Sequence, residues 1–146
     1  MLDVNLLRRD LPHVIATAGP ALAARGLAER VRLEGGSFFD GVPEGGDCYL
    51  LKSVLHDWED DDCVRILRAC APALASGTVL LVVERLMGDP ATDRETTMSD
   101  LNMMVLPGGR ERTAEEFDAL VSAAGLRVAR TVPAAGAFHA IEVVTT

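Results

Sequence analysis

The sequence lacks the features that identify secreted, membrane-spanning and nucleic-acid-binding proteins. No apolar run is long enough to cross a bilayer, and the start has neither the charged nor the apolar segment of a signal peptide. The 14 basic side chains are outnumbered by 22 acidic ones, and the net charge of -8 repels phosphate backbones and anionic membranes. We therefore expect a cytoplasmic protein that has neither nucleic acid nor membrane as a partner.

Cysteine and aromatic residues are also scarce. Three cysteines without CxxC spacing fit reduced thiols better than a disulfide framework. Cys63 and Cys70 lie on one face of an expected helix, where we expect them to pack in the core. With 49% hydrophobic residues, 4% aromatics and 146 positions, the composition predicts one compact domain rich in small aliphatic side chains.

Hydrophobic periodicity alternates between strand and helix patterns, with Gly or Pro at most joins. This alternation predicts an α/β fold with an open, mostly parallel sheet. The last two strands form an antiparallel hairpin across a Pro-Ala-Ala-Gly turn. Strands are expected at residues 30–34, 47–52, 78–84, 126–132 and 137–145, helices at 12–25, 61–74, 97–106 and 114–125, and a break at 107–109. Thr113 and Glu116 form a capping box at the start of the last helix.

Polar residues follow several of the expected strands, where ligands collect in open parallel sheets. Lys52 and His56 come after the strand at 47–51, and Glu84 ends the strand that begins at residue 78. Asp10 follows a short apolar pair in the same manner. A lone His in a strand-to-helix turn is more often a capping residue than a base, so this pattern alone leaves both roles open.

Seven phrases of the sequence, taken together, carry a family resemblance. In order and spacing they resemble S-adenosylmethionine-dependent O-methyltransferases of the caffeate and polyketide type. The phrases are DLPHV (10–14), GGSFF (35–39), LLKSVLHDW (50–58), RILRAC (65–70), LLVVE (80–84), DLNMM (100–104) and GGRERT (108–113). The resemblance covers nearly all of the chain from Asp10 onward and implies a Rossmann-like methyltransferase sheet.

The resemblance implies a function and three catalytic residues. The expected reaction transfers a methyl group to a hydroxyl of an aromatic or polyketide-like small molecule. His56 matches the family's general base, and Glu84 and Glu111 match the acidic residues that flank it. Carboxylates beside an imidazole fix its tautomer and favour its charged form, which suits a proton acceptor.

The cofactor residues implied by the resemblance are Asp10, Ser37, Phe38 and Lys52. Asp10 binds the ribose hydroxyls, Ser37 and Phe38 border the adenine, and Lys52 lies beside the methyl donor. The family usually has Asp where Ser37 stands, and a hydroxyl accepts from the adenine amino group more weakly than a carboxylate does. Asp10 also suits the N-cap of the helix that starts at Pro12.

Other residues near the motifs have competing interpretations. Asp57 is expected to satisfy backbone groups, Asp60 to cap the next helix, and Asp61 and Asp62 to complement its dipole. A metal site there is disfavoured, because three consecutive helical Asp side chains point apart. Four residues suit either a ligand pocket or the core: Trp58 beside the adenine, and Met98, Met103 and Met104 around the acceptor.

The main departure from the family lies at the start of the chain. The family begins with a helical dimerisation domain and a first strand with a glycine-rich loop, and nothing here matches either; no GxGxG occurs. Residues 1–146 are therefore expected to form a partial catalytic domain. Three outcomes are open for such a domain. A complementing chain supplies the missing part, the exposed strand edges pair with each other or with a second copy in a homodimer, or the chain is inactive.

These outcomes define the alternatives for function. The alternative to catalysis is a non-catalytic fragment or subunit that acts by binding a partner along its open sheet edge. A drift to hydroxylation or decarboxylation is a third possibility, which His56 argues against. Whichever alternative holds, we expect the 146-residue chain alone to bind S-adenosylmethionine poorly, because it has no complete donor site.

Overall fold

The computed structural model describes residues 5–74, 77–89, 91–105 and 109–146. The chain divides into two compact units, Met1–Val42 (the N-terminal unit) and Pro43–Thr146 (the core unit). Most of the break expected at 107–109 lies outside the described residues, and so does the side chain of Met104. None of the helices in the described ranges has the length and apolar composition needed to cross a membrane.

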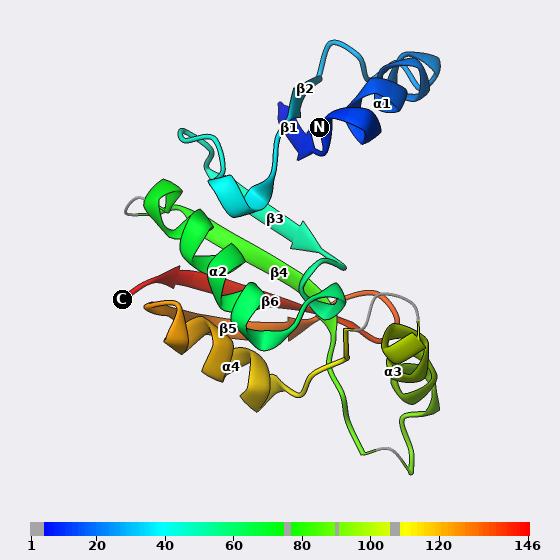
Figure 1. Cartoon of the computed structure of the whole chain (residues 1–146), viewed down its shortest axis with the longest axis vertical. Helices are drawn as coiled ribbons and strands as arrows, with labels where there is room; N and C mark the ends of the chain where they lie inside the picture. Colours follow the sequence, from blue (N-terminus) through cyan, green and yellow to red (C-terminus); the bar gives the residue numbers. More distant parts are fainter. Residues whose placement is uncertain (1–4, 75–76, 90, 106–108) are drawn as a thin grey trace. The chain divides into compact units, whose positions relative to one another are not determined.

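The N-terminal unit is a single βαβ motif. Strand β1 (Leu6–Asp10) pairs in parallel with β2 (Val31–Gly35), and α1 (Pro12–Ala24) connects them and packs against β2 (Figure 1). Pro at the start of α1 suits a position whose N–H has no helical partner. The N-cap of α1 is Leu11, because the helix begins at Pro12, so the N-cap interpretation of Asp10 is wrong. Oδ1 of Asp10 accepts from the adjacent Leu11 amide, which lies before the helix.

The core unit contains a four-stranded sheet in the order β3-β4-β6-β5. Strand β3 (Cys48–Lys52) pairs in parallel with β4 (Val79–Arg85), and β4 pairs antiparallel with β6 (Phe138–Thr145). The edge strand β5 (Leu126–Pro133) forms the expected antiparallel hairpin with β6. The structure thus confirms the α/β class and the closing hairpin.

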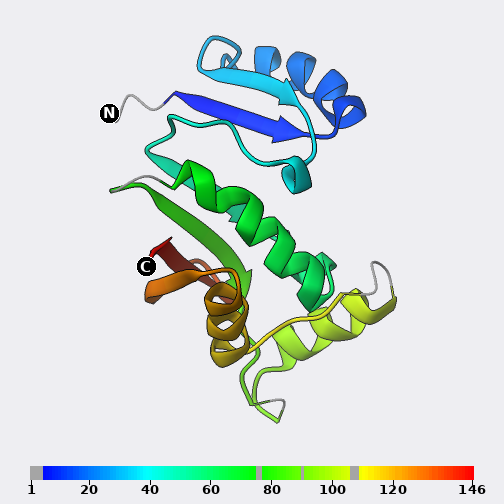
Figure 2. The same ribbon diagram turned by 60° about the vertical axis from the view of Figure 1, so that its left-hand side comes forward.

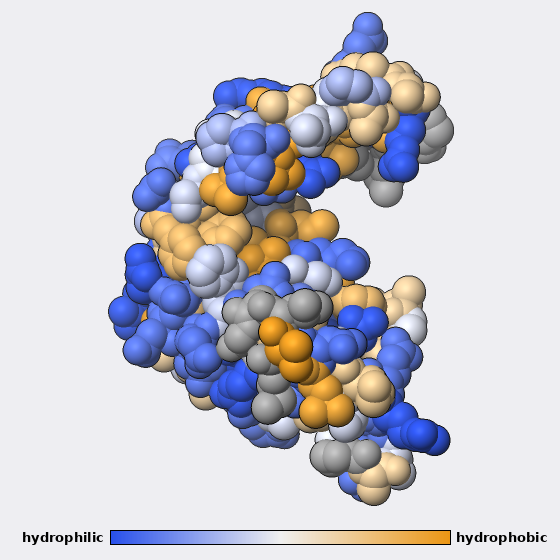
Figure 3. All heavy atoms as spheres, turned by 45° about the vertical axis from the view of Figure 1, so that its right-hand side comes forward, coloured by the Kyte–Doolittle hydropathy of each residue, from blue (hydrophilic) through white to orange (hydrophobic). Residues whose placement is uncertain are grey.

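Helices α2 (Asp60–Cys70) and α4 (Ala114–Ala123) lie side by side on one face of this sheet, as Figures 1 and 2 show. The predicted capping box is confirmed, since the Thr113 hydroxyl accepts from the Glu116 amide and the Glu116 carboxylate accepts from the Thr113 amide. Helix α3 (Arg94–Val105) precedes the segment that leads to α4. It exposes Met98, Leu101 and Val105, in a region where Figure 3 shows apolar atoms at the surface.

The core lies between the two helices and the sheet. Cys63 and Cys70 are buried on the inner face of α2, as the periodicity predicts. Along β4, the side chains of Leu80, Val82 and Glu84 are buried while the alternating ones are half-buried. The described residues therefore cover one face of β4 fully and the other face only in part. The continuous apolar run in the sequence, by contrast, is typical of a strand that is covered on both faces.

Candidate active site

The candidate site is built on the turn between β3 and α2. Residues Leu55–Asp57 form a short 3-10 helix in which Leu55 is fully buried. Ser53, at the entrance to this turn, has φ 53°, a left-handed conformation that is costly for a residue with a side chain. It is the sole non-glycine residue with positive φ in the described parts of the chain. Strain of this kind concentrates at functional sites.

His56 lies in this turn with both catalytic-candidate glutamates beside one edge of its ring. Nδ1 is 3.4 Å from Oε2 of Glu84 and 3.6 Å from Oε1 of Glu111. At the other edge, Nε2 is 3.4 Å from Oδ1 of Asp57. The His56 side chain is 10% exposed and that of Asp57 is 44% exposed, so the Nε2 edge of the ring has a partly exposed neighbour.

The two glutamates differ in their surroundings. Glu84 ends the buried stripe of β4, and its Oε1 accepts from the backbone amides of Val54 and Leu55, both at 2.9 Å. Glu111 accepts a 2.6 Å hydrogen bond from the Ser99 hydroxyl of α3. One carboxylate is thus held by the turn that carries His56, and the other by a neighbouring helix.

These surroundings shift the pKa values of His56, Glu84 and Glu111 in different directions. The Glu111 carboxylate is the main cause of a raised pKa for His56; burial opposes it, and the charges of Glu84 and Asp57 add to it. Burial raises the pKa of Glu84. Burial also acts to raise the pKa of Glu111, but the His56 ring and the Ser99 hydroxyl outweigh it, and the net pKa is lowered. Opposed shifts among neighbouring groups are typical of acid–base sites.

Three buried polar atoms converge here without a hydrogen-bond partner. They are Nδ1 of His56, Oε2 of Glu84 and Oε2 of Glu111. Buried polar atoms in folded proteins almost always have partners, so unpaired atoms that cluster at one place point to a catalytic role or to a missing ligand or water.

Two further aspartates lie near His56. Oδ1 of Asp57 lies 3.4 Å from Nε2 of His56, and its expected contact with backbone groups stays a prediction. Asp60 is not the N-cap of α2, because Glu59 occupies that position and Asp60 is the first helical residue. The Asp60 carboxylate instead accepts from Arg110 and Arg112, and these partners lower its pKa against the raising effect of burial.

Three of the four predicted cofactor residues lie in the N-terminal unit. Asp10 ends β1 directly opposite Gly35 at the end of β2, and Ser37 and Phe38 follow two and three residues later. A carboxylate, a hydroxyl and an aromatic ring therefore share the carboxyl edge of a parallel strand pair, a donor set that fits a nucleoside. Asp10 also accepts from Arg8, and Ser37 accepts from the Phe39 amide as an N-cap.

The remaining candidates lie in the core unit. The Lys52 ammonium lies 4.5 Å from the centre of the Phe138 ring, and the Arg85 guanidinium makes a second cation–π contact with the same ring, also at 4.5 Å. Met98 is exposed, while Met103 and Trp58 are half-buried. Within the described ranges, no group of three or more His, Cys, Asp or Glu side chains is arranged to hold a metal ion.

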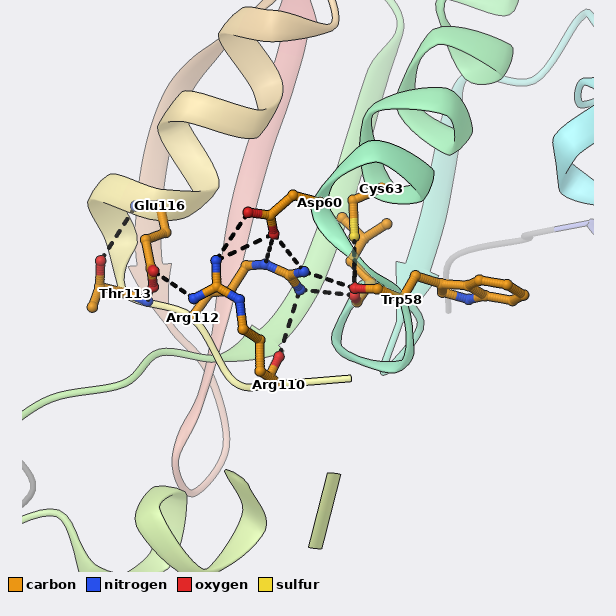
Figure 4. Close-up of polar contacts among 8 residues, drawn as sticks. Trp58, Asp60, Cys63, Arg110, Arg112, Thr113 and Glu116 are labelled. Atoms are coloured by element: carbon orange, nitrogen blue, oxygen red, sulfur yellow. Dashed lines mark hydrogen bonds and ion pairs between the residues drawn. The ribbon is translucent and has the colours of Figure 1, made fainter. Parts of the chain in front are cut away.

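Sequence reasoning misses a second layer of residues around the site. Arg112 is fully buried, and its guanidinium reaches Asp60 and two carbonyls of the His56 turn (Figure 4). Ser99 and Asp100 of α3 hold the side chain and backbone of Glu111. The one feature of the sequence that points to Arg112 is its position directly after Glu111 in the GGRERT phrase.

Comparison with known proteins identifies relatives along nearly the whole chain. The sequence profile of the O-methyltransferase domain matches residues 3–127. A mitomycin biosynthesis 6-O-methyltransferase from Streptomyces lavendulae is 45% identical over 140 residues, which cover 95% of this chain and 39% of the relative. The aclacinomycin 10-hydroxylase of Streptomyces purpurascens is 42% identical over 130 residues, covering 81% of this chain and 35% of that protein.

A solved structure extends the similarity to the fold. It is an O-methyltransferase from neocarzinostatin biosynthesis in complex with S-adenosyl-L-homocysteine and 1,4-dihydroxy-2-naphthoic acid. The two chains are 37% identical with a TM-score of 0.84, over 96% of this chain and 42% of the other. The fold is thus Rossmann-like, and the chain spans about two fifths of the length of the relatives that it matches.

Proposed function

The chain belongs to the O-methyltransferase domain family, and on this premise we propose that it is the catalytic portion of an enzyme that methylates a hydroxyl of an aromatic or polyketide-like small molecule. S-adenosylmethionine is the proposed cofactor and His56 the general base. The observation that carries this proposal is the His56 ring, whose Nδ1 faces the buried Glu84 and Glu111 while its Nε2 lies beside the partly exposed Asp57.

The proposed chemistry assigns a separate task to each ring nitrogen. The cofactor, when bound, supplies the methyl group from its sulfonium sulfur. His56 keeps a proton on Nδ1, toward the two carboxylates, and accepts the hydroxyl proton at Nε2. Glu84 and Glu111 stabilise the positive charge that the ring then acquires, and both hold the ring in orientation. The acceptor oxygen is thereby freed of its proton as the new O–C bond forms.

The cofactor contacts are proposed for the carboxyl edge of the N-terminal unit. Asp10 accepts from the ribose hydroxyls, and Ser37 and Phe38 border the adenine. The Asp10 carboxylate is about one-third exposed, which leaves it available to a ligand despite its contact with Arg8. Lys52 is proposed to lie beside the methyl donor.

A non-catalytic role is the second candidate, favoured by the free edge of β3. Among the described residues β3 pairs only with β4, and its Leu50 side chain is 61% exposed. An unpaired edge with an apolar side chain is suited to strand addition by a partner chain or a second copy.

The test compares this chain alone with a chimera that adds the N-terminal part of the mitomycin relative. Transfer of a tritiated methyl group to 1,4-dihydroxy-2-naphthoic acid is measured for both. We expect transfer by the chimera and very weak or undetectable transfer by the 146-residue chain. His56→Gln in the chimera lowers kcat by about 100-fold or more, since general-base catalysis contributes that much.

His13→Gln is the matched control, because His13 is an exposed residue of α1. Equal methyl transfer by the His56→Gln and His13→Gln chimeras would refute the base assignment. A chimera that hydroxylates the acceptor instead of methylating it would assign the chain to the reaction named for the hydroxylase relative. Micromolar binding of S-adenosylmethionine by the chain alone, in a calorimetric titration, would contradict the expected need for a further segment.

A further inference from the structure

The turn that carries His56 is held from outside by a short segment, residues 109–112. The Arg110 amide donates to the His56 carbonyl at 2.9 Å. Gly109 lies so close to the turn that a Cβ atom there would come within 1.8 Å of the same carbonyl oxygen. The backbone of His56 is therefore packed directly against this segment.

Arg112 completes this contact with its side chain. Nη1 donates to the Leu55 carbonyl at 2.9 Å and Nη2 to the Trp58 carbonyl at 2.7 Å. Nε and Nη2 both donate to Oδ1 of Asp60, at 3.0 and 2.8 Å. All three guanidinium nitrogens are thus engaged, with carbonyls on either side of His56 and with the first residue of α2 (Figure 4).

The position of Arg112 is itself fixed by the sheet. Its carbonyl accepts from the Met87 amide at 2.8 Å, and residue 112 forms a parallel bridge with Leu86 just beyond β4. The side chain is 0% exposed. A buried guanidinium with this many partners is costly to desolvate and is retained where its geometry matters.

We propose that Arg112 is a positioning residue, which holds His56 in place by binding the Leu55 and Trp58 carbonyls that flank it. Glu84 holds the opposite side of the same turn through the Val54 and Leu55 amides. The turn is therefore restrained at both its N–H and its C=O groups. This inference rests on the proposed function, because the orientation of His56 matters only if the ring takes part in the reaction.

The test uses Arg112→Lys with Arg110→Lys as the matched control. Both arginines bind Asp60, but only the Arg112 side chain reaches the turn carbonyls. Lysine keeps the positive charge and lacks the planar fork, so it cannot bind both carbonyls and the carboxylate at once. Both variants are made in the 146-residue chain, labelled for NMR, without methyl donor or acceptor.

Two quantities are measured in the folded state, well below the unfolding temperature. The first is the pKa of His56, from its ring signals, which His56→Gln identifies. The charged groups facing the ring are Asp57 in the turn, Glu84 on β4 and Glu111 in the 109–112 segment. A ring that moves away from them loses their stabilisation of its proton. The second quantity is the hydrogen-exchange rate of the Trp58 amide, which donates to the Leu55 carbonyl.

We expect the pKa of His56 to fall in Arg112→Lys and to stay unchanged in Arg110→Lys. The Trp58 amide exchanges at least about tenfold faster in Arg112→Lys, because a hydrogen bond to a charged donor is lost on each side of the ring. A purely stabilising role lowers the unfolding temperature but moves neither quantity in the folded state.

Unchanged values in Arg112→Lys, or equal changes in both variants, would overturn the positioning role. Failure of Arg112→Lys to fold, while Arg110→Lys folds, would overturn it too and make Arg112 a determinant of the fold. The outcome is separable from the proposed function. Full methyl transfer by His56→Gln would refute the base while leaving the NMR shift in Arg112→Lys intact.

Discussion

The two units of the chain differ in how much they bury. Every buried side chain among the described residues belongs to the core unit, and none of residues 5–42 is buried. The three predicted catalytic residues lie in the core unit, whereas three of the four predicted cofactor residues lie in the N-terminal unit. The proposed acid–base chemistry therefore has a packed support within the described chain, and most of the proposed cofactor contacts do not.

The physical reason lies in the number of layers. In the core unit, α2 and α4 together cover one face of a four-stranded sheet, so that side chains such as Leu67 and Phe117 are sealed from water. A single helix on two strands leaves both β-edges and one sheet face without a covering layer of its own. Such a motif has too little buried apolar area to offset the loss of chain entropy unless further structure packs on it.

The largest expected difference between the units is in hydrogen exchange. We expect backbone amides of β1 and β2 to exchange at least about a thousandfold faster than those of β4 and β6, because local opening ranges from almost no cost to the full unfolding free energy. Exchange measured by mass spectrometry on the intact chain tests this. Equal protection of the two strand pairs would remove the contrast between the units.

A pair of identical substitutions gives the next largest effect. Leu67→Ala removes a fully buried side chain of α2, and we expect it to lower the unfolding free energy of the core unit by about 2–5 kcal/mol. Leu33→Ala, at a half-buried position of β2, costs about 1 kcal/mol or less. Urea unfolding followed by the fluorescence of Trp58, the one tryptophan, measures the core unit, and hydrogen exchange of the β1 and β2 amides at increasing urea concentration measures the N-terminal unit. Similar costs for both substitutions would mean that the N-terminal unit is packed as well as the core.

The sequence predicts the elements that depend on local patterns. A continuous apolar run identifies β4, helical periodicity identifies α2, and the Thr113–Glu116 capping box identifies the start of α4. Strand ends also bring His56 near Glu84, because the turn after β3 follows a strand that pairs in parallel with β4. These features follow from neighbours in sequence or from the geometry common to parallel strands.

The contacts that sequence reasoning misses join distant positions. Arg112 binds Asp60 across 52 residues, and no local pattern distinguishes that pair from a helix cap and a solvated arginine. Ser53 adopts a left-handed conformation without the glycine that would signal it. Asp60 is assigned to the cap because N-terminal Asp residues usually serve that role, whereas two arginines compete for its carboxylate here.

The smallest expected effect is a pH dependence confined to the core unit. The pKa of His56 is raised above its ordinary value of 6.5, chiefly by Glu111, with Glu84 and Asp57 adding to it. The folded state therefore favours the protonated ring. This stabilisation is fully present below the unfolded pKa and is lost as the pH rises through the higher folded pKa.

The measurement compares the unfolding free energy of wild type with that of His56→Gln. Both are obtained from urea unfolding, followed by Trp58 fluorescence, at pH values from below the unfolded pKa of His56 to above its folded pKa. We expect the wild-type advantage to be largest below about pH 6 and to decline as the pH rises through the folded pKa of His56, by less than the cost of Leu67→Ala. His13→Gln, in the N-terminal unit, is the control for removing a histidine. An advantage that grows as the pH rises would mean that the neutral ring is the form favoured by the fold. Glu84 and Glu111 would then not stabilise the positive charge that the ring acquires when it accepts the hydroxyl proton, and that part of the proposed mechanism would be refuted.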